Sequence, residues 1–193
     1  MLNKISVGLI AVLLVILVIP IAQAVDQNVS ITATVDQVLT FNLGGVTDVY
    51  FGILGAGGTK YASSTSMDGS TEYYPAHLMN VATNGTGGYS VAVSGNTLTS
   101  GVDTISPLIA SSTPTPGTEQ FGLNVGWTTG SGEATISYGT FGYYMFNSGD
   151  TIIENAGVTG NDQYVLTYIA NIAPLTEAGS YTTTITYTTT GHF

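Results

Sequence analysis

The sequence predicts an all-β protein, folded as a single antiparallel β-sandwich of about eight to ten strands with jelly-roll-like or immunoglobulin-like connections. Apolar and polar residues alternate repeatedly after residue 24, whereas that part of the chain lacks the period of about 3.6 residues that marks a helix. Tight-turn pairs such as Asp68-Gly69 and Asn84-Gly85 separate the alternating runs. Threonine and tyrosine, which pack well on pleated surfaces, recur within the runs.

Residues 1–24 predict an N-terminal signal helix, so that the sandwich domain comprises residues 25–193. Lys4 precedes an uninterrupted apolar run over residues 7–19, and Pro20 and the small-x-small pattern Ala22-Gln23-Ala24 follow. The apolar run is shorter than the roughly 20 residues of a membrane-spanning helix. We therefore expect cleavage after Ala24, contact with the membrane only before cleavage, and an extracellular or cell-surface location. The alternative is a leader helix that is retained, as in a type IV pilin.

The first alternating run of the sandwich domain is unusually long. Its apolar residues all fall on odd numbers: Val29, Ile31, Ala33, Val35, then Leu39, Phe41 and Leu43. At about 3.3 Å per residue, the run greatly exceeds an ordinary strand. Either the strand bends at Asp36-Gln37 and enters both sheets, or its first part projects to another subunit. In the second case, Val29, Ile31, Ala33 and Val35 are the residues that exchange between copies.

Later runs predict the remaining strands. They begin near residues 78, 89, 121, 134, 164 and 181, and turns at residues 147–150 and 160–162 interrupt them. The run at 164–169 is apolar on nearly both faces, which indicates a central strand. In the last run, Tyr181, Ile185 and Tyr187 share one face opposite a row of threonines.

The charge balance excludes nucleic acid as a partner. The chain has twelve Asp and Glu against two Lys and Arg, and its formal net charge is −10. Removal of the leader leaves Lys60 as the only strongly basic side chain. Nucleic-acid affinity depends on Lys and Arg neutralising phosphates, so this surface repels such a ligand.

The sequence shows no catalytic constellation, and we expect no enzymatic activity. It has no Gly-x-Ser-x-Gly elbow, and its acidic residues lie beside turns, where solubilising charges belong. The chain has no cysteine, and its two histidines, His77 and His192, are expected to be solvated or capping residues rather than metal ligands. No cofactor is expected except structural calcium. Its weak candidates are the turn carboxylates Asp68, Glu72 and Asp150, since calcium prefers oxygen ligands.

Two short patterns predict the covalent attachment of glycans. Asn28-Val29-Ser30 and Asn84-Gly85-Thr86 are acceptor sequences for N-glycosylation, so Asn28 and Asn84 are candidate modification sites. A carbohydrate could also bind without covalent attachment, because the tyrosines and Trp127 could stack on its sugars.

Several segments resemble small exported β-sandwich proteins of archaea and ultrasmall bacteria. The segments are Val81–Val91, with the pattern V-x-T-N-x-x-x-G-Y, then Pro116–Val125, and the closing pair Tyr164–Asn171 and Ala178–Tyr187. A looser likeness connects the chain with camelysin/TasA-like biofilm fibre subunits and archaeal bundling pilins. That likeness implies a cysteine-poor jelly-roll-like sandwich whose subunits exchange a strand.

These observations favour a non-enzymatic structural protein of the cell surface, which assembles into a filament or biofilm fibre by donor-strand complementation. Its main partner would be further copies of itself, because a head-to-tail contact that does not close generates filaments. The alternative is a secreted carbohydrate-binding or adhesive sandwich.

Overall fold

The computed structural model describes residues 29–44 and 48–193, apart from the side chains of residues 127 and 128. The expected leader and Asn28 lie outside these residues. The chain divides into two units, residues 1–35 and 36–193, and the strands of the described residues belong to the second. No helix within the described ranges has the length and apolar character needed to cross a membrane.

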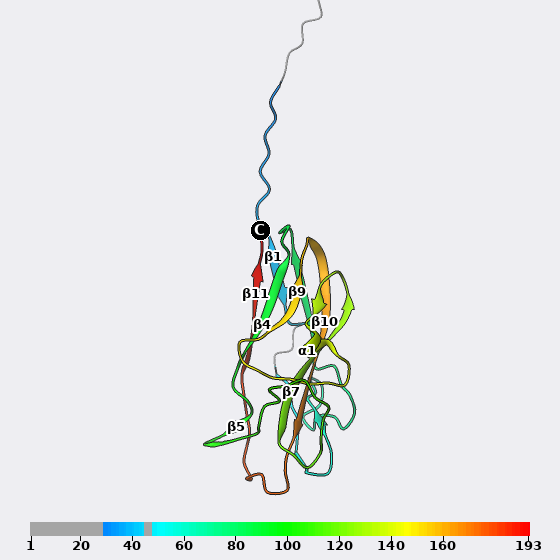
Figure 1. Cartoon of the computed structure of the whole chain (residues 1–193), viewed down its shortest axis with the longest axis vertical. Helices are drawn as coiled ribbons and strands as arrows, with labels where there is room; N and C mark the ends of the chain where they lie inside the picture. The colour runs from blue at the N-terminus through cyan, green and yellow to red at the C-terminus, as the bar shows by residue number, and fades with distance from the viewer. Residues whose placement is uncertain (1–28, 45–47) are drawn as a thin grey trace, which may run out of the picture. The chain divides into compact units, whose positions relative to one another are not determined.

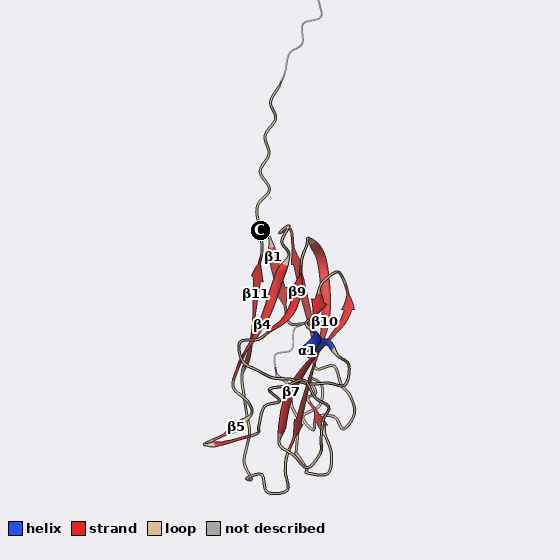
Figure 2. Cartoon of the chain, viewed as in Figure 1, coloured by secondary structure: helices blue, strands red, loops and turns tan. Residues whose placement is uncertain are grey.

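The described part of the chain is almost entirely β (Figures 1 and 2). Its elements in chain order are β1 (Leu39–Asn42), β2 (Lys60–Tyr61), β3 (His77–Thr83), β4 (Tyr89–Gly95), β5 (Thr99–Ser100), β6 (Asp103–Thr104), β7 (Gln120–Thr129), β8 (Glu133–Ala134), α1 (Ile136–Gly139), β9 (Thr151–Asn155), β10 (Thr159–Asn171) and β11 (Ile185–Gly191). The expected all-β class is therefore confirmed.

Two antiparallel sheets pack together in a sandwich-like arrangement. One has the order β1-β3-β10-β2, with β7 also paired to β10, and the other has the order β11-β4-β9-β8. A separate hairpin joins β5 to β6. β10 pairs with three strands and is buried on both faces from Leu166 onward, which confirms that the run at 164–169 is central.

Side chains from both sheets form one core between them. The five-stranded sheet contributes Met79, Val81, Leu123, Val125, Tyr164 and Leu166, and the four-stranded sheet contributes Tyr89, Val91, Val93 and Ile153. The alternation read from the sequence sets these faces. In β4, for example, the odd-numbered residues from Tyr89 to Val93 are buried and their neighbours are not.

The predicted strand at 134–138 is mostly wrong. β8 ends at Ala134, and Ile136–Gly139 form the single helical turn α1. The predicted turn at 160–162 is also wrong, because these residues belong to β10 and contain a register shift between Thr159 and Asp162. A β-bulge of this kind adds a residue to a strand without ending it.

The long first run is divided. Only β1 joins a sheet, and its Leu39 and Phe41 are half-buried against the core while Thr40 and Asn42 are exposed. Residues 29–38 belong to no strand of the described structure. The interpretation in which a single strand bends and enters both sheets is therefore not what the described residues show.

Candidate functional site

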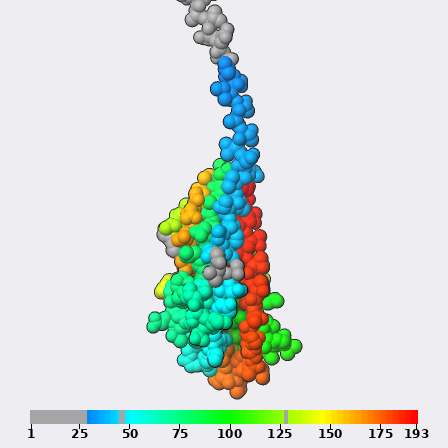
Figure 3. Space-filling model, turned by 180° about the vertical axis from the view of Figure 1, so that it is seen from behind, coloured from blue at the N-terminus to red at the C-terminus, as the bar shows by residue number. Residues whose placement is uncertain are grey.

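The sandwich has an open side between two edge strands. Among the described strands, β1 pairs only with β3, and β11 pairs only with β4. A Cβ atom built on Gly191 of β11 would lie 3.5 Å from the Leu39 side chain, so the two edges meet at that end. Figure 3 shows β1, in blue, beside β11, in red. The outer edge of each strand offers backbone N–H and C=O groups for a further strand.

Beyond this meeting point, the segment that follows β1 and the segment that precedes β11 line a groove of about 1260 Å³. One wall consists of residues 48–54, and the other consists of residues 176–185. The buried side chains of Leu98, Phe121 and Tyr168 contribute to the lining. Ile53 and Met67 are 90% and 74% exposed, so a considerable apolar surface faces solvent.

His77 lies in the groove lining, which corrects the expectation of a solvated histidine. It is the first residue of β3, it is buried, and its ring meets Tyr168 edge-on at 5.8 Å. The hydroxyl of Tyr168 is hydrogen-bonded to that of Tyr187 on β11. Burial raises the pKa of Tyr168, and both burial and the neighbouring Tyr168 raise that of Tyr187. Both phenols are therefore uncharged at neutral pH. His192 is exposed, and its backbone pairs with Gly87 and Gly88.

The groove and the beginning of the folded unit lie at opposite ends of the sandwich. β1 begins at Leu39, which pairs with Thr83 beside the turn at residues 84–88. Gly191, the last residue of β11, pairs with Tyr89 at the same end. The groove wall at 176–185 adjoins the other end of β11, where Ile185 pairs with Gly95.

The four residues expected to exchange between copies are all exposed. The exposed fractions are 82% for Val29, 90% for Ile31 and 83% for Val35, and Ala33 is also exposed. These residues belong to the first unit of the chain. Burying a Val or Ile side chain contributes roughly 1.5–3 kcal/mol, so this segment carries apolar surface that a partner could cover.

The structure does not gather the calcium candidates. Asp68 and Glu72 are exposed, and the Asp68 carbonyl oxygen accepts a hydrogen bond from the Lys60 Nζ at 3.0 Å. The Asp150 carboxylate accepts hydrogen bonds from the Tyr138 hydroxyl and the Asn147 side chain. Within residues 29–44 and 48–193, no three His, Asp or Glu side chains are grouped as metal ligands. The calcium site stays a prediction.

A buried carboxylate that sequence reasoning missed joins the two sheets. Asp162 is fully buried, and each of its carboxylate oxygens accepts several hydrogen bonds. The donors are the Tyr89 hydroxyl at 2.7 Å, the Asn155 side-chain amide at 2.6 Å, the Thr159 hydroxyl at 2.7 Å, and the backbone N–H groups of Ser131 at 2.7 Å and Gly132 at 3.1 Å. Burial alone would raise the pKa of Asp162, but these donors lower it below its usual value. The sequence alternation could have indicated that Asp162 is buried, because Asp162 is even-numbered like the core residues Tyr164, Leu166 and Tyr168.

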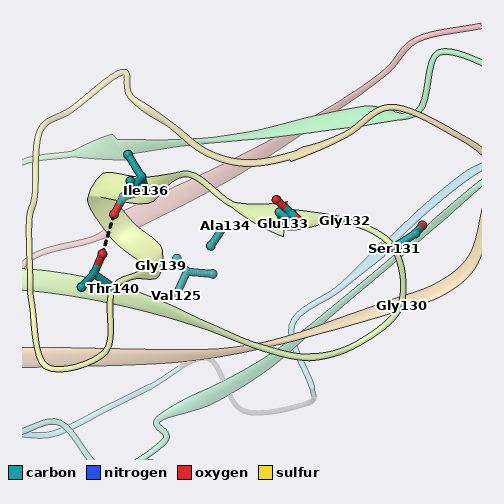
Figure 4. A pocket seen from close by; sticks show the side chains of 9 residues that line it. All are labelled: Val125, Gly130, Ser131, Gly132, Glu133, Ala134, Ile136, Gly139 and Thr140. Atoms are coloured by element: carbon teal, nitrogen blue, oxygen red, sulfur yellow. Dashed lines mark hydrogen bonds between the residues drawn. The ribbon is translucent and has the colours of Figure 1, made fainter.

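Beside this carboxylate is a second hollow, of about 560 Å³. Figure 4 shows it between the turn at residues 130–132 and α1, with Val125 and Ala134 also lining it. Thr140 donates its hydroxyl hydrogen to the Ile136 carbonyl oxygen at 2.9 Å. Glu133 is the only charged side chain in the lining. Nothing in this lining resembles a nucleophile with its base, and the hollow is a weaker site candidate than the groove.

A pair of exposed aromatic rings lies on the outer side of the five-stranded sheet. The ring centroids of Tyr73 and Phe141 are 5.3 Å apart, and the two residues are 39% and 76% exposed. Tyr61, whose ring contacts Tyr73, links this pair to the buried Tyr144.

The buried Asn124 holds the loop that carries Phe141. The Asn124 Nδ2 lies 2.8 to 2.9 Å from the carbonyl oxygens of Tyr138, Thr140 and Tyr143. Gly122, on the same face of β7, leaves room for Tyr144, because an added Cβ would lie 2.7 Å from the Tyr144 Cβ. The small residues that alternate along β7 therefore allow loops to pack against its outer face.

No protein-family model matches this chain, and a search of curated proteins also finds no match. The resemblance to exported sandwich proteins and to fibre subunits therefore stays a prediction.

Proposed function

We propose that this chain is a non-enzymatic structural subunit that polymerises by inserting residues 29–35 of one copy, here called the donor segment, into the groove of the next. One observation carries the proposal: an apolar segment with the alternation of a strand is exposed in a chain that also has an open groove, walled by residues 48–54 and 176–185. An added strand would satisfy edge backbone groups and bury both apolar surfaces. Jelly-roll-like or immunoglobulin-like connections between the strands are part of this proposal.

The dimensions of the two partners are compatible. A seven-residue donor segment in extended conformation spans about 23 Å at roughly 3.3 Å per residue. Its side chains alternate, so Val29, Ile31, Ala33 and Val35 would face the groove lining while serine and threonine face solvent. The donor segment contains no charged residue, so it would bring no charge against the apolar part of the groove lining.

Head-to-tail growth follows from the placement of the groove. The folded unit begins at Asp36, at one end of the sandwich, and the groove adjoins the other end. A contact between unlike surfaces of identical subunits does not close unless a rotation makes it a ring. A filament is the expected product, and export to the cell surface, with cleavage after Ala24, is part of the same proposal.

Electron microscopy of the purified chain beginning at Val25 tests this proposal. We expect filaments from that chain and none after deletion of residues 25–35. A smaller change is Ile31→Asp, which places a charge against the groove lining. The matched control is Thr32→Asp, which places the same charge on the solvent side of the donor segment and should still assemble. Monodisperse particles from the unchanged chain, or filaments from the deletion variant, would contradict the proposal.

A second candidate function, binding of a neutral carbohydrate, is favoured by the exposed Tyr73 and Phe141 pair. Fixed aromatic rings offer flat apolar faces with polar rims, which suit the C–H faces of sugars. The net charge of −10 disfavours acidic polysaccharides.

Co-sedimentation with insoluble neutral polysaccharides checks this candidate. Phe141→Ala should weaken binding at least threefold, and Val102→Ala is the control because Val102 is a 95% exposed apolar residue between β5 and β6. Equal binding by both variants would remove this candidate.

A further inference from the structure

The side chain of Asn84 extends the pairing of β1 beyond the sheet. Its Oδ1 accepts a hydrogen bond from the Val38 backbone N–H at 2.7 Å, and its Nδ2 donates to the Asp36 carbonyl oxygen at 2.7 Å. One amide group thus binds a donor and an acceptor two residues apart on the same edge, as a neighbouring strand would. Asp36 is the first residue of the unit that comprises residues 36–193, so the Asn84 side chain holds the beginning of that unit.

Neighbouring contacts fix Asn84 in this position. The Val38 carbonyl oxygen accepts hydrogen bonds from the Asn84 backbone N–H at 3.2 Å and from the Thr83 hydroxyl at 3.0 Å. The Thr83 hydroxyl oxygen in turn accepts one from the Gly85 N–H at 3.0 Å. A Cβ on Gly85 would lie 2.7 Å from the His192 carbonyl oxygen, so the close approach of the C-terminal residues requires glycine there.

The geometry of the Asn84 amide limits its chemistry as an acceptor for a glycan. Both hydrogen bonds point to one strand edge, so the hydrogen donated to Asp36 lies on the same side of the C–N bond as Oδ1. A substituted amide is trans, which places a sugar attached to Nδ2 on that same side. A glycan on Asn84 would therefore occupy the position of the hydrogen that binds Asp36.

We propose that Asn84 is the positioning residue that anchors the base of the donor segment, and that glycosylation of its side chain and this anchoring exclude each other. The inference rests on the proposed function, because a donor segment fixed at its base searches less space before it reaches a groove. Glycosylation at the acceptor sequence Asn84-Gly85-Thr86 would therefore remove this anchor and suppress assembly.

Hydrogen exchange and assembly, measured on the same variants of the chain beginning at Val25, test the anchor. Asn84→Ala should raise the exchange rate of the Val38 amide at least tenfold and slow filament growth at least threefold. Two controls isolate the cause. Thr86→Val removes the acceptor sequence but keeps Asn84, and Asn42→Ala removes an exposed asparagine of β1. Both should behave as the unchanged chain does.

The outcomes separate the two proposals. Unchanged exchange at Val38 in Asn84→Ala would overturn the anchor, and so would normal growth of its filaments. Absence of filaments from the unchanged chain would overturn the proposed function, while exchange at Val38 would still report on the anchor itself.

An oligosaccharyltransferase and a lipid-linked oligosaccharide test the exclusion. We expect modification of Asn84 in the urea-unfolded chain and at least tenfold less in the folded chain. Folded chain that carries a glycan on Asn84 and still protects the Val38 amide would overturn the exclusion.

Discussion

Asp162 of β10 accepts a hydrogen bond from the Tyr89 hydroxyl of β4 at 2.7 Å, and this contact crosses between the two sheets inside the core. The same hydroxyl is 2.8 Å from that of Tyr164. A buried carboxylate is tolerated when hydrogen-bond donors surround it, and Asp162 meets this condition.

Replacement of Asp162 by asparagine should destabilise the fold strongly. The new amide nitrogen would face N–H or O–H donors and leave at least one of them without an acceptor. We expect a loss of roughly 3–5 kcal/mol in the free energy of unfolding, the scale of removing one member of a buried charged group. Chemical denaturation measures it. Asn161→Ala, at the exposed neighbouring position, is the control and should change the free energy by less than about 0.5 kcal/mol.

Acid should also weaken the fold through Asp162. The pKa of this carboxyl is lowered in the folded state, so its contribution is present above the unfolded pKa of about 3.9 and is lost as pH falls through the folded pKa. Denaturation midpoints measured from pH 5 downward should therefore decline. Asp162→Asn should show a shallower decline than the unchanged chain, and equal slopes would contradict this assignment.

Alkali should weaken the fold through the buried tyrosines. Burial raises the pKa of Tyr164 to about 12, and it raises that of Tyr89 further. Their contribution is present below the unfolded pKa of about 10 and is lost as pH rises through the folded values. Ultraviolet titration should show a group of phenols that ionise only as the protein unfolds. Smooth titration of every tyrosine near pH 10 in the folded state would contradict this expectation.

Asn124→Asp should be more harmful than Asn124→Ala. The alanine variant loses the donor that holds the loop at residues 138–143, at a cost of about 1–3 kcal/mol. The aspartate variant would place a carboxylate against three carbonyl oxygens that lie within 2.9 Å of the amide nitrogen. Chemical denaturation of both variants measures which one has the lower free energy of unfolding. The reverse order would contradict the role of the Asn124 amide as a hydrogen-bond donor to this loop.

Assembly should accelerate with salt. Asp48 and Glu177 line the groove, and Asp36 follows the donor segment directly, so these like charges oppose the encounter. The screening length falls from about 10 Å at 0.1 M to about 3 Å at 1 M ionic strength, and apolar attraction persists. Light scattering measures the rate. Glu177→Gln should assemble faster at low salt and depend less on salt, whereas slowing by salt would argue against an apolar donor contact.

Alternation in the sequence correctly predicted which side chains at the end of the chain face the core. Tyr181, Ile185 and Tyr187 pack against the core as expected, and Thr186, Thr188 and Thr190 are exposed. This succeeds because the period of a strand is local and does not depend on its partners.

The sequence-based predictions failed where pairing with a neighbouring strand interrupts the alternation of buried and exposed residues. In β9, Ile152 and Ile153 are both buried, because the register with β4 shifts between Val91 and Ala92 and breaks the alternation. The sequence gives no pattern for such a shift, so β9 was not predicted. The groove was also not predictable, since its walls, residues 48–54 and 176–185, are far apart in the chain.

The meeting of Leu39 with Gly191 has a practical consequence. The last residues of the chain lie against the turn that carries Asn84, and a Cβ on Gly191 would lie 2.7 Å from the Phe193 ring. In the proposed filament, an affinity tag fused after Phe193 would emerge beside the base of the donor segment. Tagged preparations should therefore be proteolytically trimmed before any measurement of polymer growth.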